Sequence, residues 1–183
     1  MEFDLSYIKD SKNLILNKIS YLQNLCNKYE DFKIANSYKE NEEIKWSKHR
    51  TVIECWENEK LLHFLEEATH RSQLQKEVVL DIDEKINDEL LEKIYNNLKF
   101  YNLNFAIFST GSKGFHIHIE IPNNNFFTSE NFRRNFIYSF KKEFADELKY
   151  SSNVMVALEF TPHWKSGKIK KVIMSYPHGW WFI

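Results

Sequence analysis

The stretch "FSTGSKGFHIHIEI", residues Phe108 to Ile121, carries two short strand patterns on either side of a turn. The turn contains Gly111 and Gly114, and glycine reaches backbone angles that other residues avoid. After the turn, apolar and polar residues alternate as they do in a half-buried strand. We therefore predict a β-hairpin whose strands are residues 104–109 and 115–121.

Strand and helix patterns alternate on both sides of this hairpin. In chain order they predict a strand at Glu77–Asp83, a helix at Lys85–Phe100, the hairpin, a helix from Thr128 or Ser129 to Tyr150, and strands at Asn153–Phe160 and Lys168–Tyr176. The order β-α-β-β-α-β-β is typical of an α+β fold. We predict an RRM-like antiparallel sheet with its helices on one face.

The first third of the chain reads as helical or irregular. Residues 11–30 place apolar side chains at helical spacing, and residues 59–69 repeat that stripe. Between them, residues 31–50 are mostly polar and show no clear period. No glycine- or proline-rich linker follows, so we expect a helical N-terminal region, residues 1–70, packed on a core of residues 71–183.

Composition narrows the class of protein. The chain has 183 residues, 43% of them hydrophobic, which suits one compact domain. A net charge of -1 argues against a generally basic coat for nucleic acid, although a local basic groove stays open. Cys26 and Cys55 stand far apart, which favours a reducing cytoplasm over a disulfide framework or a zinc ribbon. With no leader pattern and no long apolar run, we expect a cytoplasmic protein without membrane contact.

Asp81 and Asp83 occupy alternate positions at the end of a predicted strand, so their carboxylates point to the same side. Two such acids can hold a divalent metal ion, and without a cation they would repel each other. Taken alone, the same pattern also fits a strand that leaves the core for solvent.

The glycine turn offers a second candidate site. Lys113 supplies a point charge suited to phosphate, and His116 projects from the strand that follows. An ordinary hairpin with a solvated lysine is the alternative. In a β-α-β-β unit the first and third strands lie side by side at the centre of the sheet, so we expect Asp81 and His116 to share one face.

Two further features lie near the end of the chain. Glu159 ends a predicted strand and could add a third carboxylate, although a solvent-facing glutamate fits equally. Basic, polar and aromatic residues suited to phosphate contacts and base stacking follow it, namely Lys168, Lys170, Lys171, Ser175, Tyr176 and His178. Trp180, Trp181 and Phe182 fit either this cluster or a core cap.

In order along the chain, "KEVVLDID", "STGSKGFHIHI" and "ALEF" with "KIKKVIMSYPHG" resemble the three motifs of the archaeo-eukaryotic primase superfamily. The resemblance covers residues 76–179. It implies that Asp81 and Asp83 bind catalytic metal and that the turn, with Ser112, Lys113, Gly114 and His116, contacts the phosphates of the incoming nucleotide.

For the third motif, the resemblance implies that Glu159 is the third metal ligand, where the family usually has aspartate. It also implies that Lys171, Ser175 and His178 contact the nucleotide. The expected protein is a DNA primase or primase-polymerase that uses two Mg²⁺ or Mn²⁺ ions, a single-stranded DNA template, and NTP or dNTP. A primase large subunit or a helicase is the expected partner.

Two alternatives remain at this point. "FHIHI" also fits the histidine pattern of rolling-circle replication (HUH) endonucleases, in which both histidines bind metal and a helical tyrosine, here Tyr138 with Lys141 or Lys142, attacks DNA. The second alternative is a primase-like subunit that binds nucleic acid or a partner and catalyses nothing.

Overall fold

The computed structural model describes residues 13–29, 32–57, 65, 69–85, 87–121, 130–141, 154–163 and 166–179. The helices in these ranges are α1 (Asn13–Lys28), α2 (Val52–Glu57), α4 (Asp88–Phe100) and α5 (Glu130–Lys141). The strands are β1 (Lys33–Glu40), β2 (Glu43–Trp46), β3 (Arg50–Thr51), β4 (Thr69–Ser72), β5 (Glu77–Ile82), β6 (Phe105–Ser109), β7 (Phe115–Glu120), β8 (Met155–Ala157) and β9 (Lys171–Tyr176). None of the described helices is long and apolar enough to cross a membrane.

The described strands form two antiparallel sheets. The first has the order β2-β1-β4-β8, with β3 also paired to β1, and the second has the order β5-β7-β6-β9. The second sheet contains the predicted hairpin as β6 and β7, with Ile107 opposite Ile117. The predicted α+β class, with an antiparallel sheet and an N-terminal helix before it, is confirmed.

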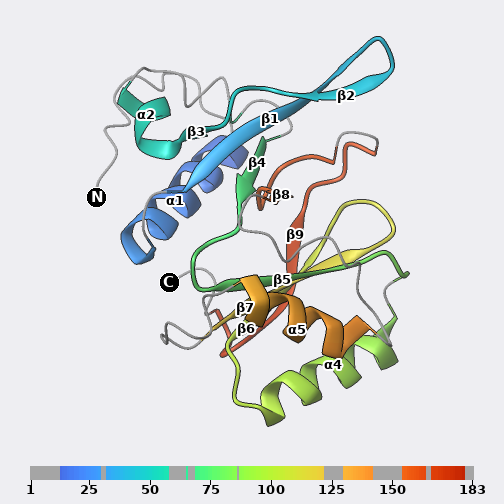
Figure 1. Cartoon of the computed structure of the whole chain (residues 1–183). Coiled ribbons are helices and arrows are strands. Elements are labelled where there is room, and N and C mark those ends of the chain that lie inside the picture. Colours follow the sequence, from blue (N-terminus) through green and yellow to red (C-terminus); the bar gives the residue numbers. More distant parts are fainter. Residues whose placement is uncertain are drawn as a thin grey trace.

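Helices α4 and α5 cover one face of the second sheet (Figure 1). Val78, Leu80 and Ile82 of β5 pack in that core with the apolar stripe of α4. The helix begins at Asp88, three residues after the predicted start at Lys85, because Asn87 caps it by accepting a hydrogen bond from Leu90 N at 2.8 Å. Arg133 fixes α5 to the sheet by donating to the carbonyl oxygen of Glu77 at 3.0 Å.

The other face of the second sheet, called the inner face here, is turned toward α1 and the first sheet (Figure 1). Ala106 and Phe108 of β6 pack there with Leu22 of α1 and Leu158. Because neighbouring residues of a strand point to opposite faces, Asp81 lies on the inner face while Ile82 faces α4 and α5. The second sheet is therefore buried on both sides.

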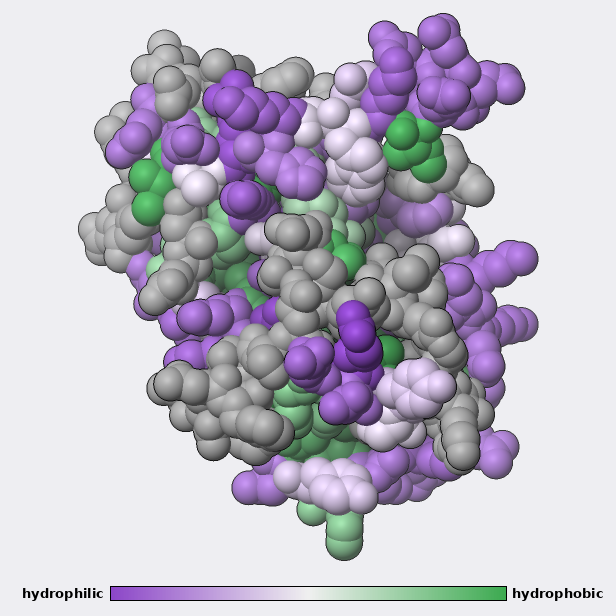
Figure 2. All heavy atoms as spheres, in the orientation of Figure 1, coloured by the Kyte–Doolittle hydropathy of each residue, from purple (hydrophilic) through white to green (hydrophobic). Residues whose placement is uncertain are grey.

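Between α1 and α2, the prediction of helical or irregular structure is wrong. Residues 33–46 form β1 and β2, which pair with Tyr38 opposite Lys45. Their pattern was unreadable because three successive residues of β1, Ile34 to Asn36, are buried, whereas all of β2 is exposed. Figure 2 shows the free end of this hairpin, at the upper right, as mostly hydrophilic.

The expected boundary after residue 70 falls inside β4, which pairs with β1 and with β8 from the end of the chain. The first sheet thus combines the N-terminal region with the C-terminal part. The predicted strand at residues 153–160 is shorter, and it joins this sheet through His70 opposite Ala157. Of the helix predicted at residues 59–69, the structure describes only Leu65, which is helical, and Thr69, which opens β4; residues 142–150 of the later predicted helix also lie outside the described residues.

Candidate functional site

The acidic end of β5 and the histidines of β7 meet on the inner face. Asp81 is the cross-strand partner of His116, and His116 Nε2 lies 3.3 Å from Asp81 Oδ1. His116 is only 6% exposed, whereas Asp81 keeps partial access to solvent. The predicted adjacency of these two strands is confirmed, but β5 lies at the edge of the sheet and not at its centre.

The glycine turn packs against the end of β5. A Cβ atom on Gly114 would lie 2.0 Å from the carbonyl oxygen of Ile82 and 3.1 Å from Cα of Asp83, so only glycine fits there. This contact holds the turn, with its exposed residues Ser112 and Lys113, beside exposed Asp83. The first two sequence motifs therefore meet at one end of the second sheet.

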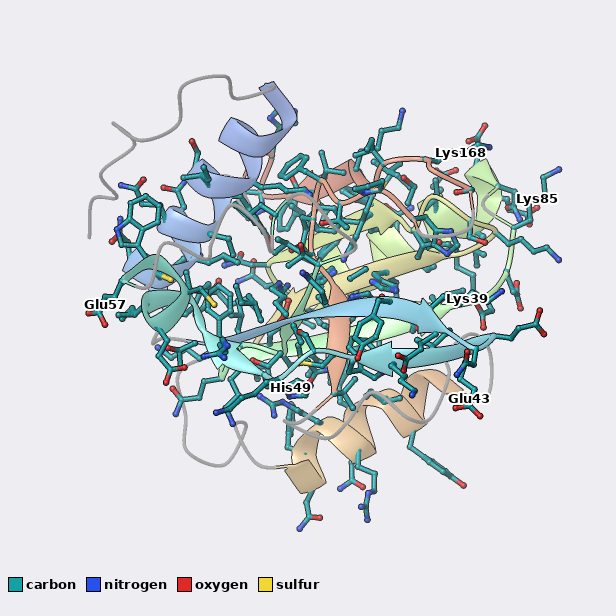
Figure 3. All side chains as sticks on the ribbon, turned by 90° about the horizontal axis from the view of Figure 1, so that it is seen from above. Lys39, Glu43, His49, Glu57, Lys85 and Lys168 are labelled. Carbon is teal, nitrogen blue, oxygen red and sulfur yellow. The ribbon has the colours of Figure 1, made fainter. Side chains whose placement is uncertain are left out.

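A second loop, of which His163 and residues 166–168 are described, packs against the same turn. Ser166 Oγ donates a hydrogen bond to the carbonyl oxygen of Gly111 at 2.5 Å, and a Cβ on Gly111 would lie 2.4 Å from the carbonyl oxygen of Lys168. In Figure 3, Lys85 and Lys168 lie at the same end of the molecule. Lys113 lies in the turn itself and Lys168 packs on it through its backbone, so two exposed lysines stand at the turn. Sequence reasoning placed Lys168 only in a C-terminal cluster, because the contact between the two loops spans more than fifty residues.

Behind this end, charged residues from both sheets are buried together. We call them the buried ion network: Arg71 of β4, Glu77 of β5, His118 of β7, and Glu159 and Lys170 from the segments that flank the 163–168 loop. Each is at most 1% exposed. Among them, sequence reasoning considered only Glu159, Lys170 and His118, and it gave none of them this role.

Arg71 uses every N–H group that it has. Its Nε donates to Glu159 at 3.1 Å, its Nη1 to Glu77 at 2.7 Å and to the Ser72 carbonyl at 3.2 Å. Its Nη2 donates to Glu77 at 2.8 Å and to Glu159 at 3.2 Å. A guanidinium has five such donors, so this buried cation is fully satisfied between two carboxylates.

Lys170 is satisfied in the same way. Its ammonium donates to the Ala157 carbonyl at 2.7 Å, to Glu159 at 3.0 Å and to His118 Nε2 at 3.1 Å, which accounts for its three protons. The opposite ring nitrogen of His118, Nδ1, lies 2.5 Å from Glu77 Oε1. Because Nε2 accepts from the Lys170 ammonium, His118 is neutral, and its Nδ1 lies between Glu77 Oε1 and Arg71 Nη2, which is 3.0 Å away.

The pKa values of the network agree with this charge assignment. Burial alone would raise the pKa values of Glu77 and Glu159, but the neighbouring cations outweigh it and hold both well below the ordinary value. Burial, and then the Lys170 charge, lower the pKa of His118 to about 4. Burial alone would lower the pKa of Arg71, yet Glu159 and Glu77 raise it. Burial lowers the pKa of Lys170, and its ion pair with Glu159 opposes this shift; with Lys170 charged, two cations balance two anions.

The expectation that Glu159 converges with Asp81 and Asp83 on metal is therefore wrong for this structure. Both oxygens of Glu159 accept hydrogen bonds from buried cations, and the residue is 0% exposed. Across the described ranges, no group of three or more His, Cys, Asp or Glu side chains is arranged to hold a metal ion. What remains at the end of the sheet is the pair Asp81 and Asp83 with His116.

The remaining predicted nucleotide contacts come from β9 and the turn that follows it. Lys171 is exposed at the start of β9 and lies opposite Ser109, whereas its neighbour Lys170 points to the inner face. Ser175 pairs with Ala106, in the row of His118, and its Oγ accepts a hydrogen bond from Gly179 N at 2.9 Å. His178 is exposed in the turn after β9, and Trp180, Trp181 and Phe182 lie outside the described residues.

Among the described residues, Tyr138 and the two histidines are not arranged as an HUH endonuclease needs. Tyr138 belongs to α5, which packs through Ile137 on the face opposite to His116 and His118. Both ring nitrogens of His118 are engaged within the buried ion network. A tyrosine on the far face of the sheet cannot act with these histidines on one phosphate.

Comparison of the sequence with protein-family models and with curated proteins found no match.

Proposed function

We propose that the chain is a template-dependent nucleotidyltransferase, a DNA primase or primase-polymerase that links NTP or dNTP on a single-stranded DNA template. The observation that carries the proposal is the contact between its first two motifs. Asp81 stands opposite His116, and Gly114 rests on the backbone that leads to Asp83. An acidic pair beside a lysine-bearing glycine turn suits a nucleotide triphosphate with its divalent metal.

The carboxylates of Asp81 and Asp83 fit a divalent cation such as Mg²⁺ or Mn²⁺. Both can be reached from solvent, and carboxylate oxygens are the ligands that these hard cations prefer. When bound, the metal would neutralise phosphate charge and activate the attacking 3′-hydroxyl. In this assignment Glu159 is not a ligand, because the buried ion network uses both of its oxygens.

The protein's own contribution is to position phosphates. Lys113 and Lys168 bring positive charge to the turn from two loops that Ser166 ties together. His116 is held in place by burial and by Asp81, and its ring can donate a hydrogen bond to a phosphate oxygen. Phosphoryl transfer depends mainly on such positioning and on charge stabilisation.

The test is incorporation of labelled nucleotide on a single-stranded DNA template with Mn²⁺. The wild-type chain should make products longer than a dinucleotide, and the double variant Asp81→Asn with Asp83→Asn should make none while it keeps its melting temperature. Glu84→Gln, a change at the adjacent exposed carboxylate, is the matched control and should keep full incorporation. Incorporation by the double variant at the wild-type rate would refute the proposal.

A primase-like subunit without catalysis is the second candidate, and the burial of Glu159 favours it. Such a subunit would bind nucleotide in a Mn²⁺-dependent way through Asp81 and Lys113 and yet form no product. It would then act beside a partner such as a large subunit or a helicase. Nucleotide binding measured together with incorporation separates the two candidates.

A further inference from the structure

We infer that this site binds one divalent cation, held by Asp81 and Asp83. A second ion would need the carboxylate of Glu159 as a ligand, and Arg71 and Lys170 already neutralise that carboxylate. The inference rests on the proposed function. It differs from the two-ion arrangement that the sequence resemblance implies, and it follows from the contacts of Glu159.

Glu159 accepts three hydrogen bonds from buried cations, and the lone pair that remains on Oε2 is closed to solvent. Oε2 accepts from Arg71 Nε at 3.1 Å, and Oε1 accepts from Lys170 at 3.0 Å and from Arg71 Nη2 at 3.2 Å. With a side-chain exposure of 0%, the carboxylate is also closed to a hydrated ion. A metal ion would have to displace two buried cations that have already used all their other donors.

The same holds for the other described glutamates of the inner face. Glu77 accepts from Arg71 and also from Leu74 N at 2.9 Å. Glu120, opposite it on β7, accepts from Asn104 at 2.9 Å and from Tyr29 at 3.1 Å. Because these contacts occupy both glutamates, Asp81 and Asp83 at the end of β5 are the carboxylates that we expect to bind the metal ion.

Charge balance leads to the same result. Arg71 and Lys170 together match Glu77 and Glu159, and His118 between them is neutral, so the network carries no net charge. A divalent ion added to it would leave an excess of two positive charges in a buried, low-dielectric place. Asp81 and Asp83 instead form a partly exposed anionic pair that a single divalent ion neutralises.

The test counts Mn²⁺ bound to the full chain by electron paramagnetic resonance, with free and bound ion resolved during a titration. We expect one Mn²⁺ per wild-type chain and a loss of that ion in Asp81→Asn with Asp83→Asn. Glu159→Gln should change the dissociation constant for Mn²⁺ by no more than about twofold, which is well under the tenfold change that corresponds to ~1.4 kcal/mol. Because this single change leaves excess positive charge, Glu159→Gln with Lys170→Met is measured beside it, since the double change keeps the network neutral.

Each outcome has a defined meaning. Two Mn²⁺ ions per wild-type chain, with one lost in the Glu159 variants, would overturn the inference while nucleotide incorporation could still support the proposed function. An absence of bound Mn²⁺ would also overturn it, and if incorporation were absent as well the proposed function would fail with it. One ion that depends on Asp81 and Asp83 but not on Glu159 supports the inference.

Discussion

Replacing Glu159 by alanine separates the two roles that this residue could have. If Glu159 were a metal ligand, its removal would relieve repulsion among carboxylates and leave the metal-free fold as stable as before or more so. In the structure it is the buried partner of Arg71 and Lys170. Its removal should therefore destabilise the chain without any metal present.

The size of the effect follows from the contacts that are lost. Three donors of charged groups lose their acceptor at a site with 0% exposure, namely Arg71 Nε, Arg71 Nη2 and the Lys170 ammonium. Breaking a buried ion pair by removing one partner costs about 3–5 kcal/mol. For a chain of this length, each kcal/mol lowers the melting temperature by about 2–4 °C. We expect the melting temperature to fall by roughly 6–20 °C.

Urea unfolding with EDTA present measures this free energy directly. Glu92→Ala, at an exposed position of α4, is the control and should change stability by less than about 0.5 kcal/mol. A loss below about 1 kcal/mol for Glu159→Ala, or a gain, would refute the assignment of Glu159 to the buried ion network.

Three further results are expected. A Cβ on Gly114 would lie 2.0 Å from a backbone oxygen, so Gly114→Ala should lower the free energy of unfolding in urea by more than about 2 kcal/mol. Gly167→Ala is the control, because nothing lies within 4 Å of its added carbon, and it should cost only the ~1 kcal/mol of a positive φ. Equal costs would contradict the close packing at Gly114. Burial and the neighbouring Lys170 ammonium lower the pKa of His118 to about 4, below its unfolded value of about 6.5. The contribution of His118 to the free energy of unfolding is therefore complete above pH 6.5 and falls by about 3 kcal/mol toward pH 4. His118→Gln should flatten this fall, and an unchanged fall would contradict a neutral buried ring. Lys113→Ala should weaken Mn²⁺-dependent nucleotide binding about tenfold without changing the melting temperature. Lys33, an exposed lysine at the start of β1, provides the control, and an equal loss in Lys33→Ala would point to unspecific charge attraction.

Local patterns in the sequence predicted the second sheet well. The glycine turn at residues 110–114 and the alternation after it define β6 and β7, and the short connection makes their pairing almost certain to be antiparallel. The apolar stripe of residues 88–100 predicts α4 for the same local reason. Adjacency of β5 and β7 followed from the order of elements, and it brought Asp81 to His116.

The first sheet could not be read in this way, because its strands lack the alternation that marks a half-buried strand. Residues 34–36 of β1 are all buried by neighbours from distant parts of the chain, and residues 38–40 are all exposed. Sheet position, not local sequence, decides this burial. The same distance hides the pairing of β4 with β8, which joins residues more than eighty positions apart.

The expectation that Glu159 binds metal failed for a related physical reason. The burial of its counter-ions, like the burial of β1, depends on residues that are distant in the sequence. A carboxylate that ends a strand beside other acids suggests metal only while its counter-ions are unknown. Here the counter-ions are Arg71, 88 residues earlier, and Lys170, 11 residues later, and neither position stands out in the sequence. Lys170 is buried while the adjacent Lys171 is exposed, so their roles separate only once β9 has a defined inner face. Whether an acid near the end of a sheet can bind metal thus depends on which neighbouring cations are buried beside it. In this chain Arg71 and Lys170 are buried beside Glu159 and pair with it.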